Sequence, residues 1–426
     1  MLRQMVPQIE SQIRRLQAPL AVELPEGQTL GPPDAPVKLR FSAWSSLARL
    51  KAGQIGALGE DFVEGKLKLE GRMRDVMFVM AGLLPGNPAA LETGWAARFL
   101  RRARSNTAHT PAQDAAQAQF HYDVSDDFFA LWLDPRRVYS CAYYGDASMN
   151  LSQAQEGKLD HICRKLMLQP GERFLDIGTG WGALLLWAAE HYGVHATGIT
   201  LSKNQHAHVQ RLIVDKGLQE RVRVELRDYR DMDESQPYDK ISSVGMFEHV
   251  GQTNMTAYFA KVRRLLAPGG LVLNHGITAG GLDNRQLGAG MGEFIEKYIF
   301  PGGELLHVSA VLSHLTRAGL EMVDTENLRP HYARTLWAWS DALEAQLPAA
   351  MQVLRQSSDE SRAGKILRAY RLYLAGSAMS FERGWLSLHQ LLATRPDELH
   401  AGETLKGAQS VYPFRRDYMY RLHRSA

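Results

Sequence analysis

The sequence predicts an α/β fold in which a mostly parallel sheet is covered by helices on both faces. From about residue 155, short apolar segments alternate with helix-length segments, as they do in sheets of this kind. The first apolar segment runs into a glycine-rich turn, and a helical run follows at residues 183–192. The strands expected in this part of the sequence are residues 173–177, 195–199, 222–226, 240–244 and 271–274.

Two later strands are expected at residues 322–323 and 386–392, with a helical insert between them at residues 336–373. The first 85 residues follow a different pattern. They begin with a helix-like segment and then alternate apolar and polar residues at 37–41 and 63–69, which is typical of half-buried strands. A small α+β domain is therefore expected at the N-terminus.

Changes in composition predict the domain boundaries. Residues 84–88 (LPGNP) break the regular pattern, and a basic segment and then a polar, Ala/Gln-rich segment follow. We assign residues 1–104 to the N-terminal domain and the basic segment, 105–119 to a linker and 120–426 to the main domain. The basic segment contains Arg98, Arg101, Arg102 and Arg104 around Trp95 and Phe99.

Composition argues against several classes of protein. The formal net charge of +3 is too small to suggest nucleic-acid binding. The two cysteines, Cys141 and Cys163, form no CxxC pair or Cys/His cluster, so we expect neither a disulfide framework nor a metal site. The N-terminus has no apolar signal core, and the most apolar short run, residues 183–189, is too short to span a bilayer. We therefore expect a cytoplasmic protein that is attached at most to a membrane surface.

The turn after the first strand is the most informative local motif. Residues 174–182 (FLDIGTGWG) place Gly178 and Gly180 between a strand and a helix. Glycine allows a sharp bend and the close approach of a ligand, and the helix N-terminus offers free N–H groups to a carboxylate or phosphate. Dinucleotide-binding folds use such glycines too, but the full G-x-G-x-x-G fingerprint is absent because the third glycine is Gly182. The turn predicts a bound cofactor.

The segments after the next two strands add to this site. Nucleotide-binding folds usually place an acidic residue after the second strand, where it holds ribose hydroxyls. Residues 199–205 (ITLSKNQ) contain no acidic residue, so Thr200 and Gln205 are the candidates for these hydrogen bonds. Ser202 is expected to cap the next helix. After the third strand, residues 228–231 (DYRD) are placed to flank an adenine ring.

Five further motifs occur together in the main domain. They are residues 120–125 (FHYDVS), 139–144 (YSCAYY), 245–251 (GMFEHVG), 296–303 (EKYIFPGG) and 332–339 (YARTLWAW). With these motifs, over about residues 115–400, the sequence resembles the cyclopropane-fatty-acyl-phospholipid synthases. The resemblance implies the class I methyltransferase fold, a seven-stranded Rossmann-like sheet with helical insertions whose last strand is antiparallel to the others. It also implies transfer of a methylene group from S-adenosylmethionine to the cis double bond of an unsaturated phospholipid acyl group.

The resemblance further implies roles for individual residues. The implied S-adenosylmethionine site consists of Tyr139, Ser140, Gly178, Gly180, Thr200, Leu201, Gln205, Tyr229 and Arg230. In this family the base is thought to be a bicarbonate ion bound inside the protein, and the matching residues here are Cys141, Glu248, His275, Ile277 and Tyr332. Glu248 would accept the proton-bearing edge of the ion, and His275 and Tyr332 would donate to its oxygens. Cys141 and Ile277 would contribute backbone or packing contacts.

The chemistry explains why such a site is needed. An alkene has no proton that a base could remove before it attacks the sulfonium methyl group, so positioning must supply much of the rate. The attack leaves a carbocation, which aromatic faces can stabilise. Ring closure then needs a base near the new methyl group.

Two positions depart from the family pattern. Thr179 stands in the glycine turn where many relatives have cysteine, and we expect it to change packing against the cofactor and little else. A cysteine once suspected as a nucleophile in the family aligns with Ser377, so the sequence does not support a covalent thiol mechanism. We interpret Ser377 as a small helix-packing residue.

Two basic-aromatic segments are candidates for contact with phospholipid. The arginines between residues 98 and 104 suit anionic lipid, although a solvated linker would have the same composition. Residues 412–421 have the same character, but they could equally form a packed tail or a dimer contact, which leaves a homodimer open. The N-terminal domain resembles the lipid-facing domain of the bacterial synthases. The expected location is therefore peripheral, at the inner face of the membrane.

Three alternative functions remain open on the sequence. A fatty-acyl C-methyltransferase would form a methylene- or methyl-branched lipid from the same cation. A small-molecule methyltransferase would leave residues 296–303 and the bicarbonate residues without a purpose. A lipid-binding protein with a degenerate enzyme domain is opposed by the intact glycine turn, Gln205 and Glu248.

Overall fold

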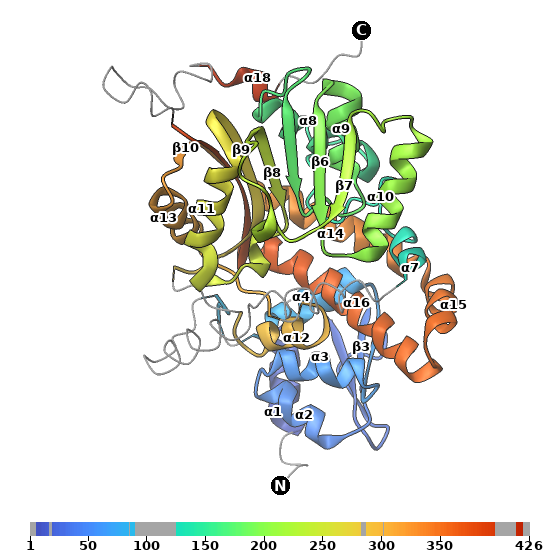
Figure 1. The fold of residues 1–426 in the computed structure, drawn as a ribbon. Coiled ribbons are helices and arrows are strands. Elements are labelled where there is room, and N and C mark those ends of the chain that lie inside the picture. The colour runs from blue at the N-terminus through green and yellow to red at the C-terminus, as the bar shows by residue number, and fades with distance from the viewer. Residues whose placement is uncertain are drawn as a thin grey trace.

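The computed structural model describes residues 6–16, 19–84, 86–89, 125–282, 287–300, 302–396 and 415–420. Figure 1 shows a large sheet flanked by helices on one side of α16 (Glu360–Glu382) and a smaller N-terminal part on the other. The basic segment around Arg98 and the linker at 105–119 lie outside the described residues. None of the described helices is long and apolar enough to cross a bilayer.

The large sheet has seven strands, and its topology matches the predicted fold class. The strand order is β10 (Glu321–Asn327), β11 (Leu386–Thr394), β9 (Leu266–Ala279), β8 (Tyr238–Val244), β5 (Arg173–Ile177), β6 (His195–Thr200) and β7 (Val222–Leu226). β11 is antiparallel to both of its neighbours, whereas the other neighbouring strands run parallel. The predicted antiparallel last strand is therefore confirmed.

Both faces of this sheet are buried, because alternate residues of its central strands enter different hydrophobic cores. Phe174 of β5 packs in the core with α8 (Leu151–Lys165), α9 (Ala183–Tyr192) and α10 (Lys203–Asp215). The next residue, Leu175, packs in the core with α11 (Met255–Leu265) and α13 (Val308–Arg317). Burial on both faces explains why neighbouring positions of β5, such as Phe174 and Leu175, are both apolar.

The helical insert between β10 and β11 is longer than predicted at both ends. It consists of α14 (Arg329–Glu344), α15 (Leu347–Ser357) and α16. α14 begins seven positions before the predicted start at 336, because Pro330 occupies the first turn, where its missing N–H group costs nothing. A further short helix, α12 (Met291–Tyr298), lies between β9 and α13.

The N-terminal part is an α+β unit, as predicted. Its sheet has the order β2 (Thr29–Leu30), β1 (Leu20–Glu23), β3 (Val37–Phe41) and β4 (Leu67–Glu70). Its helices are α1 (Val6–Arg15), α2 (Trp44–Lys51), α3 (Ile55–Val63) and α4 (Met73–Gly82).

The prediction of a strand at residues 63–69 is wrong for the first half of that range. Val63 is the last residue of α3, and the strand starts only at Leu67. The N–H groups of Gly65 and Lys66 donate to the carbonyls of Phe62 and Asp61 at 3.1 and 2.8 Å, which closes the helix C-terminus. The apparent alternation thus arose from a helix end and a turn in front of a short strand.

The N-terminal part packs directly on the helices of the main domain. α3 contacts both α12 and α16, and α4 contacts α16. The N–H group of Gly56 donates to the carbonyl of Ala289 at 2.8 Å, just before α12. At the rim, the ammonium of Lys297 lies 2.9 Å from the carboxylate of Glu60, but both side chains are exposed, so this pair adds little stability. One continuous hydrophobic core joins the two parts and fixes α3 over the helical insert.

Candidate active site

The glycine turn after β5 opens onto a cavity. Gly178 and Gly180 both have positive φ angles, of 79° and 57°, which L side chains rarely adopt. A Cβ atom at Gly180 would meet nothing within 4 Å, and one at Gly178 would meet only the Met246 side chain, at 3.1 Å from its Cγ. The backbone at this turn is therefore exposed to whatever fills the cavity.

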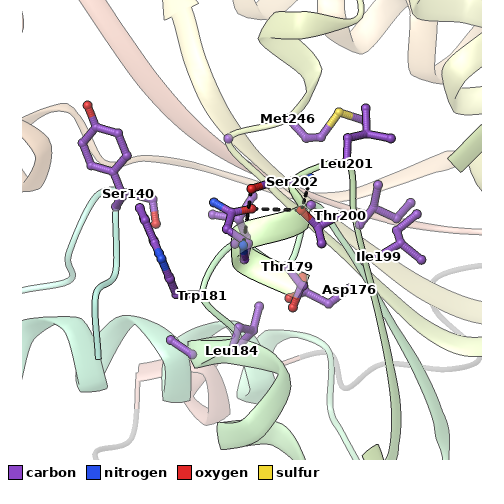
Figure 2. A pocket seen from close by; sticks show the side chains of 18 of the residues that line it. Ser140, Asp176, Thr179, Trp181, Leu184, Ile199, Thr200, Leu201, Ser202 and Met246 are labelled. Carbon is purple, nitrogen blue, oxygen red and sulfur yellow. Dashed lines mark hydrogen bonds between the residues drawn. The ribbon is translucent and has the colours of Figure 1, made fainter. Parts of the chain in front are cut away.

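All nine residues predicted to hold S-adenosylmethionine line this one cavity, which we call the cofactor cavity. They are Tyr139, Ser140, Gly178, Gly180, Thr200, Leu201, Gln205, Tyr229 and Arg230. Figure 2 shows Ser140 and Trp181 on one side of it, across from Thr200 and Leu201. Thr179 lines the same cavity.

A short hydrogen-bond network fixes the segment after β6 (Figure 2). The Thr200 hydroxyl donates to Oε1 of Gln205 at 2.9 Å, and Ser202 caps α10, as predicted, by accepting from the N–H group of Gln205 at 3.3 Å. Gln205 is 3% exposed, and its Nε2 has no hydrogen-bond partner among the described residues. A buried amide donor of this kind needs an acceptor, and a ribose hydroxyl in the cavity would supply one.

The segment after β7 presents a flat face to the same cavity. Tyr229 and Arg230 lie in a short 3-10 helix, η2 (Tyr229–Asp231). The carboxylate of Asp228 accepts from the backbone N–H and from Nε of Arg230, at 2.8 and 2.9 Å. The Arg230 guanidinium in turn lies over the Tyr229 ring, 5.3 Å from its centroid. This arrangement suits an aromatic base.

Two buried charged residues that line the cofactor cavity were not predicted. Asp176 is buried and accepts from the hydroxyl of Ser242 at 2.6 Å, and burial raises the pKa of its carboxyl group. Lys158 is also buried, donates to the Ser140 hydroxyl at 3.0 Å, and has its pKa lowered to about 8 by burial. Asp176 stands two residues before Gly178 in the glycine motif, and this position could have predicted that it lines the cavity. Lys158 lies inside α8, where no motif marks it, and only the tertiary fold brings it to the cavity.

The five residues predicted to bind bicarbonate line a second cavity, which we call the reaction cavity. They are Cys141, Glu248, His275, Ile277 and Tyr332. Glu248 lies in the 3-10 helix η3 (Phe247–His249), His275 and Ile277 lie on β9, and Tyr332 lies on α14. The reaction cavity shares Tyr139, Ser140, Gly245 and His249 with the cofactor cavity, so the two adjoin.

Only one oxygen of the buried Glu248 carboxyl group has a hydrogen-bond partner among the described residues. Its Oε1 accepts from the N–H group of Ile277 at 2.7 Å, while its Oε2 has no hydrogen-bond partner among the described residues. Burial raises the pKa of Glu248 to about 7, and the hydrogen bond from Ile277 opposes this shift. Near neutral pH the group therefore exists in both the ionised and the protonated form.

His275 and Tyr332 offer neutral donors to the same cavity. Nδ1 of His275 lies 3.2 Å from the amide nitrogen of Gln390 on β11, and that nitrogen can only donate. The ring proton of His275 is therefore on Nε2, which has no hydrogen-bond partner in the described structure. Burial lowers the pKa of His275 and raises that of Tyr332, so both side chains stay uncharged.

The walls of the reaction cavity are otherwise mostly apolar and aromatic. Tyr139, Phe300, Tyr373 and Phe381 line it together with Tyr332. The Cys141 thiol donates to the carbonyl of Ala142 at 3.2 Å, and burial raises its pKa, so it remains a protonated packing group. Ser377, expected to be a helix-packing residue, lies on α16 and lines the cavity wall.

The described part of the C-terminal segment packs against the main domain. α18 (Asp417–Tyr420) contacts α8, and Met419 is fully buried. The Met419 carbonyl lies 2.9 Å from Nδ1 of His161. Among the three interpretations of residues 412–421, a packed tail therefore holds for residues 417–420.

Comparison with known proteins agrees with this geometry. The family model for mycolic acid cyclopropane synthetase matches residues 109–391. A probable fatty acid methyltransferase of Pseudomonas putida is 42% identical over 394 residues, covering 92% of this chain and 96% of that protein. Cyclopropane mycolic acid synthase 1 of Mycobacterium tuberculosis is 39% identical over 285 residues, covering 65% of this chain and 95% of that protein.

Solved structures extend the comparison. The mycolic acid cyclopropane synthase CmaA1 in complex with SAH and CTAB has a TM-score of 0.60 and 38% sequence identity, covering 66% of this chain and 97% of that protein. Coclaurine N-methyltransferase, at 20% identity and a TM-score of 0.61, shares the fold. The protein therefore belongs to the mycolic acid cyclopropane synthetase family and is an S-adenosylmethionine-dependent methyltransferase.

Proposed function

We propose that the protein transfers a methylene group from S-adenosylmethionine to the cis double bond of an unsaturated phospholipid acyl group, which forms a cyclopropane ring. The observation that carries this proposal is that Glu248 and His275 line a mostly apolar cavity beside the cofactor cavity, and that Oε2 of Glu248 and Nε2 of His275 have no hydrogen-bond partner among the described residues. An apolar cavity suits a hydrocarbon, and the two polar atoms suit the base that ring closure requires.

The cofactor cavity has the groups that S-adenosylmethionine needs. Bound there, the cofactor would supply an electrophilic sulfonium methyl group. Thr200 and Gln205 would hold the ribose, Tyr229 and Arg230 would flank the adenine, and the bare backbone of Gly178 would allow close approach. The free Nε2 of Gln205 supports this assignment, because the described protein atoms leave it without an acceptor.

The residues of the reaction cavity would orient the acyl group and protect the cation. The aromatic rings of Tyr139, Tyr332 and Phe381 line the cavity and can stabilise positive charge without forming a bond to it. The Cys141 thiol is held in its protonated form, so no thiolate is available to trap the cation. The apolar walls would also keep out water that could otherwise add to it.

Bicarbonate fits the polar end of the reaction cavity. A bound bicarbonate would supply the base for ring closure. The neutral Nε2–H of His275 and the phenol of Tyr332 would donate to its oxygens, and ionised Glu248 would accept its proton-bearing edge through Oε2. The observed donors and acceptor match the hydrogen-bonding groups of this ion.

A branched product is the second candidate. The Pseudomonas putida relative, at 42% identity, is named a probable fatty acid methyltransferase. The same cation would give a methylene-branched lipid if a 1,2-hydride shift first moved the positive charge to the carbon that carries the new methyl group, and a proton then left that methyl group. A saturated methyl branch would also need a separate reductase. Whether ring closure or the hydride shift comes first after methyl transfer therefore decides between the two products.

Replacing Gly178 with valine should greatly weaken cofactor binding. The left-handed backbone at this position costs an L residue about 1–2 kcal/mol, and the valine side chain would occupy the edge of the cavity, so affinity should fall more than about tenfold. Calorimetric titration with S-adenosylmethionine measures this. Gly86→Val, at a position with open space around its Cβ, is the control. Unchanged affinity in a folded Gly178→Val protein would rule out the assigned site.

Replacing Glu248 with glutamine should change how stability depends on pH. The pKa of Glu248 is about 7 in the folded protein and about 4.5 in the unfolded state, so wild-type stability falls as pH rises through this window. Glutamine cannot ionise, so the variant should gain up to about 3 kcal/mol relative to wild type between pH 4.5 and 8. Urea unfolding at several pH values measures the difference, with the exposed Glu220→Gln as control. Parallel curves for wild type and Glu248→Gln would show that Glu248 titrates normally.

The same Glu248→Gln variant tests the proposed base. It should bind S-adenosylmethionine almost normally but turn over roughly 10²-fold more slowly, because the ion would be weakly held. The assay is product formation on unsaturated phospholipid vesicles, in buffer stripped of carbon dioxide and then resupplied with bicarbonate. The variant should respond weakly, or only at high bicarbonate concentration. Full activity of Glu248→Gln in stripped buffer would refute bicarbonate binding at this site.

A further inference from the structure

A third cavity lies between the N-terminal part and the main domain, and we call it the distal chamber. From the N-terminal part it is lined by Ile55, Gly56, Leu58, Gly59, Phe62, Leu67, Leu69, Met77 and Met80. From the main domain it is lined by residues of α12, α16 and β11, among them Phe294, Gly376 and Leu386. None of the described lining residues is charged, and the Ser380 hydroxyl donates to the carbonyl of Gly376 at 2.8 Å. The chamber therefore suits a hydrocarbon and not a polar headgroup.

The distal chamber adjoins the reaction cavity on a different side from the cofactor cavity. The two share Leu287, Met291, Ile295, Tyr373, Ser377 and Leu386. The chamber and the cofactor cavity share no described residue. The three cavities therefore form a series, and Glu248 and His275 line the middle one.

We propose that the distal chamber receives the methyl-terminal segment of the acyl group, and that α3, β4 and α4 limit how many carbons can extend beyond the double bond. This inference rests on the proposed function, because it needs the double bond in the reaction cavity. The acyl group extends in two directions from that bond, and the end carrying the ester and headgroup is polar. An uncharged chamber at one side of the reaction cavity can hold only the other end.

The N-terminal part is then part of the substrate site and not only an appendage. The family match begins at residue 109, so the wall formed by α3, β4 and α4 lies before the matched residues. Phe62 forms part of this wall; it is 3% exposed and lies in the core that joins the two parts. The wall would limit how many carbons fit between the double bond and the methyl end. It would thereby select substrates by the position of the double bond.

Gly376 provides a way to fill the chamber. It lies on α16, and a Cβ atom there would have only an ordinary contact, 3.9 Å from the sulfur of Met77. Leucine at this position would project into the chamber, whereas alanine would occupy little of it. Gly376→Leu is therefore the test variant and Gly376→Ala the control for size.

The experiment compares two phospholipids that have the same headgroup and acyl length but differ in double-bond position. One has 18-carbon acyl groups with the bond at carbon 9, and the other has it at carbon 11, which leaves two fewer methylenes beyond the bond. Gly376→Leu should raise the kcat/KM ratio of the carbon-11 over the carbon-9 lipid by on the order of tenfold relative to wild type. Gly376→Ala should leave the ratio close to that of wild type.

The possible outcomes separate the two proposals. A wild-type protein that alkylates neither lipid would refute the proposed function. An active Gly376→Leu protein with an unchanged ratio would refute the distal chamber alone. Folding of the variant is checked by calorimetric binding of S-adenosylmethionine. If Gly376→Leu does not fold, Phe62→Leu, which widens the chamber, should shift the ratio toward the carbon-9 lipid, and no shift in that variant would equally overturn the proposal.

Discussion

The rest of the site depends on the buried carboxyl group of Glu248. Only one of its two oxygens has a hydrogen-bond partner among the described residues. A buried polar atom without a hydrogen bond costs free energy, and the reaction cavity contains two, Oε2 of Glu248 and Nε2 of His275, that have no partner among the described residues. In native proteins such atoms are usually satisfied by ordered water or a ligand, and strongly shifted pKa values concentrate at functional sites. One small oxyanion between an acceptor and two neutral donors would satisfy both atoms at once.

Two neighbouring strands of the large sheet, β9 and β11, hold the side chains of Glu248 and His275 in place. Gly276 on β9 has no side chain, and a Cβ there would come within 2.0 Å of the Phe247 ring, so that ring can lie against the strand. This contact brings Glu248 to the N–H group of Ile277. The antiparallel register pairs Gln390 of β11 with His275 of β9, and the Gln390 amide fixes the imidazole tautomer. The antiparallel last strand, β11, thus orients the imidazole of His275, which lines the reaction cavity.

Sequence periodicity predicted strands whose pattern follows local burial. It could not predict sites where segments that are distant in the sequence meet. Residues 173–177 and 222–226 have the predicted bounds, because their short apolar or alternating pattern follows their burial in the sheet. At residues 63–69 a helix end imitated an alternating strand, and the two-residue strand β2 was too short to give a signal. The glycine turn, Thr200, Gln205 and residues 228–231 were predicted from the ends of the strands, and the other site residues from the resemblance to the family. Lys158 and the distal chamber carry no motif, because α3, α4 and α16 come together only in the tertiary structure.

The three adjoining cavities would together hold the cofactor and an acyl group while the double bond becomes a cyclopropane ring. The most direct measurement is the structure of the lipid product that the purified protein forms from S-adenosylmethionine and unsaturated phospholipid vesicles. Mass spectrometry and proton NMR of the extracted lipid distinguish the candidates. We expect the acyl group to gain one methylene, to lose its alkene protons and to show the high-field signals of a cyclopropane. An acyl group that gains the same mass but shows the signals of an exocyclic methylene would contradict ring formation and establish the branched product instead.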